Sequence, residues 1–116
     1  MKSTNNHINY IEFKSHDLEA TKTFYSKAFG WQFTDYGDSY VAFEASGIAG
    51  GFEKTDKPIT NGALIVIYNE DLKTTKSRVL ELGGKLSVDT FSFPGGSRFQ
   101  FLDPSGNELA VWCYDE

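Results

Sequence analysis

Two residues of a short apolar segment near the N-terminus could do chemistry together, Tyr10 and Glu12 in the sequence INYIEFK. The segment is typical of a β-strand over residues 8–14, in which alternate side chains share a face, so Tyr10 and Glu12 lie together. A phenol can donate a hydrogen bond, and a carboxylate sheltered from water is a candidate general acid or base. If that face meets solvent, Glu12 is an ordinary surface carboxylate. If it is the inside of a curved sheet, Glu12 lies in a pocket.

An internal repeat indicates the elements that position this strand. The segment at residues 17–30, DLEATKTFYSKAFG, returns 54 positions later at residues 71–84 as DLKTTKSRVLELGG. Five of the fourteen positions match, where average composition predicts roughly one. Each copy spaces its apolar residues along one face of a helix, begins with an Asp suited to an N-cap and ends with a Gly suited to a left-handed stop. We therefore predict two equivalent helices.

Strand patterns surround both predicted helices, and each half of the chain repeats one plan. Besides 8–14, the predicted strands cover residues 31–36, 39–44, 48–52, 63–68, 85–89, 98–102 and 108–114, while residues 90–94 either continue an edge or form a loop. Each half is thus strand, helix and three strands, which predicts an α+β fold. We expect one domain over residues 1–116, with a first module at about 8–53, a linker at 54–61 and a second module at about 62–114.

Composition limits the kinds of partner and the cellular compartment that we expect for this protein. Sixteen acidic residues against eleven basic ones give a net charge of −5, without the basic stripe that nucleic-acid binding needs. No apolar run approaches the roughly 20 residues of a membrane span, and the N-terminus has no signal-peptide core. The single cysteine, Cys113, fits a reducing compartment. We expect a cytoplasmic protein with neither nucleic-acid nor membrane partners.

Several motifs on these elements resemble those of one known superfamily. They are Asp-Leu opening each helix, Phe24-Tyr25 within the first helix, Phe29-Gly30-Trp31 at its end, and Asp103-Pro104-x-Gly106-Asn107 before the last strand. The chain, from about residue 6 to 114, resembles the vicinal oxygen chelate superfamily, which includes glyoxalase I, bleomycin-resistance proteins and extradiol dioxygenases. The resemblance implies two βαβββ modules forming cupped, mainly antiparallel sheets, with the helices on the outer face, and it favours a homodimer.

In metal-dependent members of that superfamily, four side chains on four strands hold a divalent ion. By the resemblance, the four positions fall here on Tyr10, Gly50 (or Gly51), Leu64 and Ala110. None is His, Glu or Asp, so we expect no metal and no other cofactor at these positions. A relocated, largely oxygen-liganded site stays open as an alternative, with candidate ligands His7, Glu12, His16, Glu44 and Glu108.

What would remain is a hollow lined by aromatic and aliphatic groups, the usual setting of a ligand site. Strand alternation gives the expected ligand-binding set as Tyr10, Glu12, Gly50, Phe52, Leu64, Val66, Tyr68, Ala110 and Trp112. The alternative is that these side chains simply fill the hollow, in a subunit or interaction module.

The resemblance and the replaced positions together predict a metal-free protein that binds a small, partly apolar organic molecule. The competing hypothesis is an enzyme of the same superfamily, a lyase, isomerase or dioxygenase. Such an enzyme would use shifted metal ligands, or it would use Glu12 as general base and Tyr10 as hydrogen-bond donor.

Overall fold

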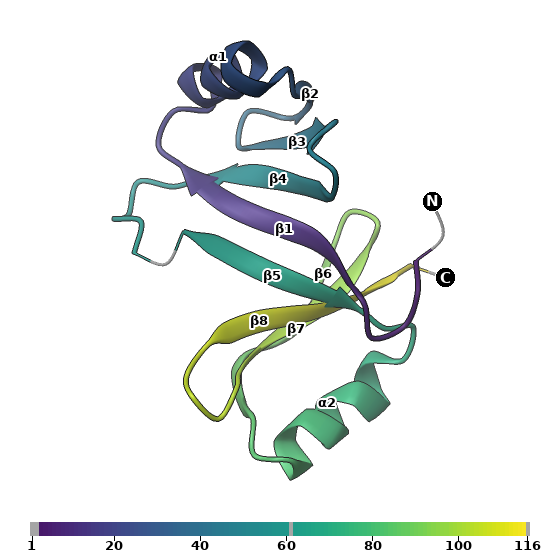
Figure 1. The fold of residues 1–116 in the computed structure, drawn as a ribbon. Helices are drawn as coiled ribbons and strands as arrows, with labels where there is room; N and C mark the ends of the chain where they lie inside the picture. The colour runs from purple at the N-terminus through teal and green to yellow at the C-terminus, as the bar shows by residue number, and fades with distance from the viewer. Residues whose placement is uncertain (1–2, 61, 116) are drawn as a thin grey trace. The chain divides into compact units, whose positions relative to one another are not determined.

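The computed structural model describes residues 3–60 and 62–115 (Figure 1). Its contacts divide the chain into two compact units, residues 10–64 and residues 1–9 with 65–116. The last residue of the predicted linker, Asn61, lies outside the described residues, as do the ends of the predicted domain, Met1, Lys2 and Glu116.

The unit at residues 10–64 is a four-stranded sheet with one helix. Its elements are β1 (Ile8–Ser15), α1 (Leu18–Phe29), β2 (Gln32–Tyr36), β3 (Tyr40–Glu44) and β4 (Ala49–Lys54). The strands lie in the order β2-β3-β4-β1, with β1 and β4 parallel and the other neighbours antiparallel. The parallel pair brings β4 beside the strand that carries Tyr10 and Glu12.

The second unit repeats this arrangement. Its elements are β5 (Ala63–Tyr68), α2 (Leu72–Glu81), β6 (Lys85–Phe93), β7 (Gly96–Leu102) and β8 (Glu108–Tyr114), and the strand order is β5-β8-β7-β6. β6 extends to Phe93, so residues 90–93 of the segment predicted as either strand or loop are strand, and two register shifts between Leu86 and Phe91 interrupt its pairing with β7. The predicted α+β class and the two βαβββ modules are therefore confirmed.

The predicted helix ends are confirmed at both copies of the repeat. Asp17 accepts a hydrogen bond from the Ala20 backbone N–H at 3.0 Å, and Asp71 accepts one from Thr74 at 3.0 Å. Each carboxylate satisfies a backbone donor that the first helical turn leaves without a partner. Gly30 ends α1 with φ 76°, a left-handed conformation that costs glycine little.

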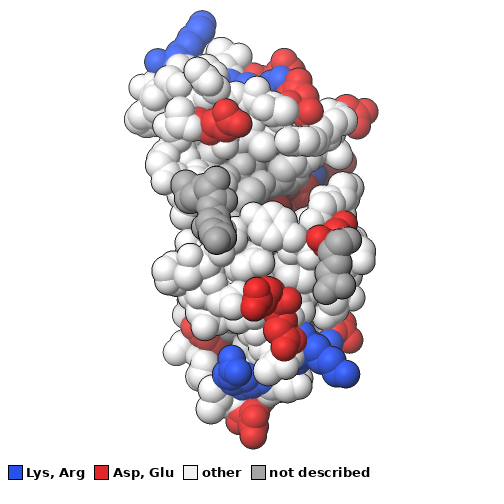
Figure 2. Space-filling model, turned by 90° about the vertical axis from the view of Figure 1, so that its right-hand side faces the viewer, with Lys and Arg blue, Asp and Glu red and all other residues white. Residues whose placement is uncertain are grey.

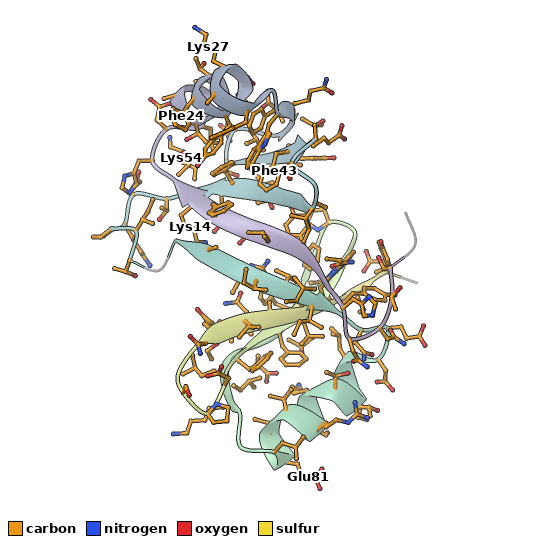
Figure 3. All side chains as sticks on the ribbon, in the orientation of Figure 1. Lys14, Phe24, Lys27, Phe43, Lys54 and Glu81 are labelled. Carbon is orange, nitrogen blue, oxygen red and sulfur yellow. The ribbon has the colours of Figure 1, made fainter. Side chains whose placement is uncertain are left out.

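One face of each sheet packs against its own helix. In the 10–64 unit, Phe43 (labelled in Figure 3) and Phe52 form a core with Val41 and Leu18, the first residue of α1. In the other unit the core consists of Phe99, Phe101 and Val111, with half-buried residues of α2 packed on it. Residues that alternate with these along each strand, such as Tyr10 and Glu12 on β1, point to the opposite face of the sheet.

On the face drawn in Figure 2, acidic side chains are scattered among uncharged ones and the basic side chains form no continuous stripe, in keeping with the net charge of −5. Neither of the two helices in the described part of the chain is both long and apolar enough to cross a membrane.

Candidate functional site

The sheet face of the 10–64 unit that lies away from α1 carries a hydrogen-bonded group of three residues, Tyr10, Glu12 and Tyr40, which we call the tyrosine–glutamate group. The hydroxyls of Tyr10 on β1 and Tyr40 on β3 form a short hydrogen bond. Tyr40 is also hydrogen-bonded to the Glu12 side chain. Tyr40 therefore contacts both candidate residues of β1, although its own strand, β3, is not paired with β1.

A glycine makes this reach across the sheet feasible. β4 lies between β1 and β3, and its residue Gly51 is opposite both Glu12 and Ala42. The Tyr40 ring passes so close over Gly51 that a Cβ there would lie 2.5 Å from Tyr40 Cζ and 2.6 Å from Cε2. Any side chain at this position would displace the ring, so Gly51 is part of the construction of the group.

Burial sets the electrostatics of the group. Glu12 is 5% exposed, which decides between the two settings predicted for it in favour of the sheltered one. Burial, together with the hydrogen bond to Tyr10 and the negative charge of Glu12, holds the pKa of Tyr40 far above its usual value. Burial thus favours the protonated phenol of Tyr40 over its phenolate.

The prediction that Gly50 and Phe52 of β4 face the ligand-binding side of the sheet was wrong. Phe52 is 3% exposed within the core that packs on α1, and Gly50 shares its face, opposite Phe43. A Cβ on Gly50 would meet the Phe43 ring and the Ile11 carbonyl oxygen. The two adjacent glycines gave no alternation from which the facing of the strand could be read, and Gly51, not Gly50, lies beside Glu12.

In the second unit, the predicted residues share the face opposite to α2. Val66 is paired with Ala110 and Tyr68 with Trp112 across the parallel strands β5 and β8. The Tyr68 and Trp112 rings meet edge to face with centroids 5.5 Å apart, and Trp112 Nε1 donates to Asn9 Oδ1 at 2.9 Å. These contacts fix the Trp112 ring. Leu64 belongs to the 10–64 unit and is half-buried.

Two polar residues on these faces were missed by the sequence reasoning. Tyr40 was assigned only to a strand, although an aromatic hydroxyl near a strand glycine is a signal that could have been used. Arg98 on β7 lies opposite Trp112, with its guanidinium carbon 5.1 Å from the centroid of the Phe91 ring. Its sequence neighbourhood, SRFQF, carries no motif that would have singled it out.

The residues at the superfamily's four metal positions do not fit a divalent ion. Gly50 (or Gly51), Leu64 and Ala110 offer no side-chain donor atom, and the Tyr10 hydroxyl is engaged with Tyr40. A divalent site is built from imidazole, carboxylate or thiolate groups. We therefore assign no metal chemistry to these positions.

The alternative ligands do not form a relocated site within residues 3–60 and 62–115, where no three His, Cys, Asp or Glu side chains gather as a metal would require. His16 Nε2 contacts the Lys57 carbonyl oxygen at 2.8 Å. Glu108 Oε2 accepts hydrogen bonds from Ser87 and Gln100 at 2.7 and 3.1 Å. Both side chains thus have local structural partners.

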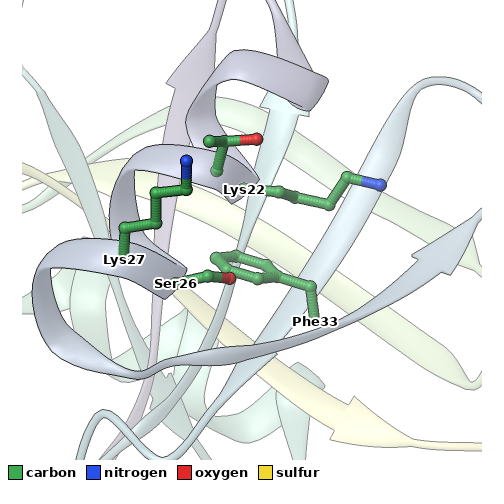
Figure 4. A pocket seen from close by; sticks show the side chains of 5 residues that line it. Lys22, Ser26, Lys27 and Phe33 are labelled. Atoms are coloured by element: carbon green, nitrogen blue, oxygen red, sulfur yellow. The ribbon is translucent and has the colours of Figure 1, made fainter.

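A shallow, open groove lies between α1 and β2 (Figure 4). It is lined by Lys22, Thr23, Ser26, Lys27 and Phe33. Lys22 Nζ forms ion pairs with Glu19 on the same helix at 2.7 Å and with Asp35 on β2 at 2.9 Å, and these carboxylates raise the pKa of Lys22. Two lysines and two carboxylates leave the groove without net charge, so it gives no indication of a charged ligand.

Comparisons with known proteins agree with this fold. Residues 7–111 match the sequence model of the Glyoxalase/Bleomycin resistance protein/Dioxygenase superfamily. A "Glyoxylase-like domain-containing protein" from Didymella fabae is 33% identical over 116 residues, covering 90% of this chain and 91% of its own.

Solved structures of low sequence identity share the fold. Hypothetical protein BH1468 from Bacillus halodurans C-125 has a TM-score of 0.80 at 13% identity, with 97% of each chain covered. A Streptomyces coelicolor methylmalonyl-CoA epimerase in complex with 2-nitronate-propionyl-CoA has a TM-score of 0.68 at 16% identity, covering 97% of this chain and 100% of that one. Because the superfamily model matches residues 7–111 and a glyoxylase-like relative is 33% identical, the chain belongs to the glyoxalase/bleomycin resistance protein/dioxygenase superfamily.

Proposed function

We propose that this protein binds a small organic molecule on the sheet face of the tyrosine–glutamate group, without a divalent ion at the superfamily's usual positions. The observation that carries the proposal is the burial of Glu12, at 5% exposure, in hydrogen-bond contact with Tyr40. Burying a carboxylate costs free energy that the core does not require, because the core of this unit packs on the other face. Buried polar groups of this kind concentrate at functional sites.

The surroundings of the group suit a partly apolar ligand. On the same face, Ala49 pairs with Tyr10 and Gly51 with Glu12, and Ala42 lies two residues after Tyr40 and opposite Gly51. Small side chains there leave the phenol rings as the principal apolar surface. Tyr68 and Trp112, on the corresponding face of the other unit, remain predicted ligand-binding residues.

Binding can be tested with ¹⁵N-labelled protein and a library of small aromatic and aliphatic fragments. We expect the backbone amides of residues 10–12, 40–42 and 51 to shift on titration, and Tyr40→Phe to weaken the effect. The matched control is Tyr36→Phe, because Tyr36 pairs with Tyr40 across β2 and β3 but has a side chain that is 61% exposed and lies outside the tyrosine–glutamate group. Fragments that shift only amides elsewhere, or that bind Tyr40→Phe unchanged, would contradict the proposal.

A second candidate function is proton transfer by Glu12, as in a lyase or isomerase. It is favoured by the sheltered carboxylate beside phenol hydroxyls, and one structural neighbour is an epimerase. Glu12 would take a proton from a carbon next to a carbonyl group, the carbonyl oxygen would hold the negative charge, and Glu12 would return the proton to carbon. Tyr10 would then turn its proton from Tyr40 toward that oxygen.

Isotope exchange distinguishes this candidate from simple binding. Methylmalonyl-CoA in D₂O should gain deuterium at the acidic carbon with the wild-type protein and not with Glu12→Gln. Exchange that continues in the variant would remove Glu12 from the mechanism, and no exchange in either protein would leave binding as the better account.

We further propose a cytoplasmic homodimer. β2 and β6 end the strand order of their units, and strand edges of this kind are commonly covered by a second chain. Light scattering on the eluted protein should give twice the 13.0 kDa mass of one chain, and a mass of 13.0 kDa would contradict the dimer.

A further inference from the structure

The strand β2 lies at the edge of its sheet and is regular along its whole length. In the described part of the chain it is paired with β3 alone, through five consecutive pairs from Gln32–Glu44 to Tyr36–Tyr40 without a register shift (Figure 1). Alternate residues of an antiparallel strand direct their N–H and C=O groups to opposite sides, so alternate residues of β2 direct theirs away from β3. A regular edge of this kind is a template for a further strand.

The edge strand of the other unit, β6, is interrupted where β2 is not. Two register shifts, between Leu86 and Val88 and between Val88 and Phe91, break its pairing with β7. Irregularities of this kind bend a strand, and they are one means by which proteins keep sheet edges from pairing with other chains. β2 has no register shift and no proline. Of the two edges, β2 is therefore the one suited to add a strand.

β2 can approach a second copy of itself without electrostatic repulsion. Its only charged residue, Asp35, forms an ion pair with Lys22 of α1 at 2.9 Å. Phe33 packs on the core beneath α1, so Phe33 and Asp35 share that face of the sheet and Thr34 points to the other face. Thr34 is the middle residue of the strand, and it is exposed and uncharged.

We propose that β2 pairs antiparallel with β2 of a second copy of this chain, about a two-fold axis through Thr34. This inference rests on the proposed homodimer and names its interface. Thr34 would lie opposite the partner's Thr34, a pair that stabilises strand pairing. Asp35 would lie opposite the partner's Phe33, and Gln32 opposite the partner's Tyr36. An axis through Asp35 would instead set two carboxylates against each other, which destabilises a strand pair.

Exposed aromatic rings near both ends of β2 give the pairing apolar surface to bury. Tyr36, the last residue of the strand, is 61% exposed. Phe29, whose ring centroid lies 6.2 Å from that of Trp31 just before the strand, is 63% exposed. A two-fold brings the Tyr36 end of each copy to the Phe29 end of the other. An interface of one strand per chain is small, so we expect a dimer that dissociates on dilution.

Lysine substitutions on the two edge strands test the interface. Thr34→Lys would place two ammonium groups together at the axis and should weaken dimerisation at least about tenfold, whereas Thr90→Lys, the same change at an exposed position of β6, should leave it within about twofold. Light scattering on the full chain, at concentrations from micromolar to millimolar, measures the dissociation constant, and amide spectra of ¹⁵N-labelled protein report whether each variant is folded. Unchanged dimerisation in Thr34→Lys would overturn the inference and leave the proposed homodimer standing.

A cysteine on the axis gives a second test, which keeps the interface intact. Facing Cα atoms of antiparallel strands lie about 4.5–5.5 Å apart, a distance that a disulfide can span. Thr34→Cys, in a Cys113→Ser background that removes the native thiol, should form a disulfide-linked dimer on mild oxidation, and Thr90→Cys in the same background should not. A Thr34→Cys protein that stays unlinked would overturn the inference.

The mass of the wild-type protein separates this inference from the homodimer on which it rests. A mass of 13.0 kDa at every concentration would overturn both. Masses that grow with concentration beyond twice that value would show that an edge pairs with a different edge, and they would overturn the two-fold. Ligand binding on the tyrosine–glutamate face is measured separately by the fragment titration, so its failure is distinguishable from the failure of this interface.

Discussion

Replacing Gly51 by alanine should force the Tyr40 ring away from the sheet. The new Cβ would lie 2.5 Å from Tyr40 Cζ, whereas ordinary van der Waals contact begins at 3.4 Å. The ring must therefore retreat by roughly 1 Å, in a packed face that adapts poorly. Its hydroxyl would then lose its hydrogen-bond geometry to Glu12 and Tyr10.

The expected loss of stability follows from three contributions. Overpacking a well-packed site costs about 1–3 kcal/mol. Losing a hydrogen bond to a charged group costs about 1.5–3 kcal/mol. Alanine is favoured over glycine inside a strand by about 0.5–1 kcal/mol, which offsets part of the loss. We expect Gly51→Ala to lower the free energy of unfolding by about 1.5–5.5 kcal/mol.

Urea unfolding in a double-mutant cycle with Tyr40→Ala measures this coupling. Without the Tyr40 ring, the alanine at position 51 has room, so Gly51→Ala should cost less than about 0.5 kcal/mol in that background. An equal cost with and without the Tyr40 ring would refute the reasoning. A Gly51→Ala variant that unfolds at the same urea midpoint as the wild-type protein would also refute it.

The remaining predictions concern stability. Tyr40→Phe should lower the free energy of unfolding by about 1.5–3 kcal/mol in urea, since it strips Glu12 of a donor. The folded pKa of Tyr40 lies above the unfolded value of 10.0, so the contribution of Tyr40 to stability is complete below pH 10.0 and is lost as the pH rises. Tyr40→Phe should therefore lose less stability at alkaline pH than the wild-type protein does. An equal alkaline loss in both proteins would count against the tyrosine–glutamate group. Phe99→Ala should cost about 3–5 kcal/mol, because Phe99 is 0% exposed, and a loss under about 1 kcal/mol would contradict the assigned core. The hydrogen bond from Thr74 lowers the pKa of Asp71 below 3.8, so its contribution exists above that pH and is lost as pH falls through the folded value; Asp71→Asn, which can still cap α2, should flatten the acid dependence of the unfolding midpoint.

The fold was predictable because local signals and the repeat agree. Asp17 and Asp71 mark both helix starts, Gly30 marks an end, and the apolar runs at residues 63–68 and 108–114 predict strands that the structure contains. Each of these signals acts within a few residues of chain, which is the range that sequence patterns report.

The site was predictable only in part, because its construction crosses strands. The shared face of Tyr10 and Glu12 follows from alternation along β1. Tyr40 enters the group diagonally across β4, through pairing that no local pattern reveals. Gly50 and Phe52 were given the wrong face because consecutive glycines carry no polar–apolar alternation, and the burial of Phe52 against α1 decides it.

The most direct test of metal-free binding on the tyrosine–glutamate face is the affinity of a fragment that shifts its amides, measured before and after exhaustive treatment of the protein with a chelator. We predict the same dissociation constant in both samples, because the residues at the superfamily's four metal positions do not fit a divalent ion. Binding that disappears with the chelator and returns with one equivalent of Mn²⁺, Ni²⁺, Zn²⁺ or Fe²⁺ would contradict it.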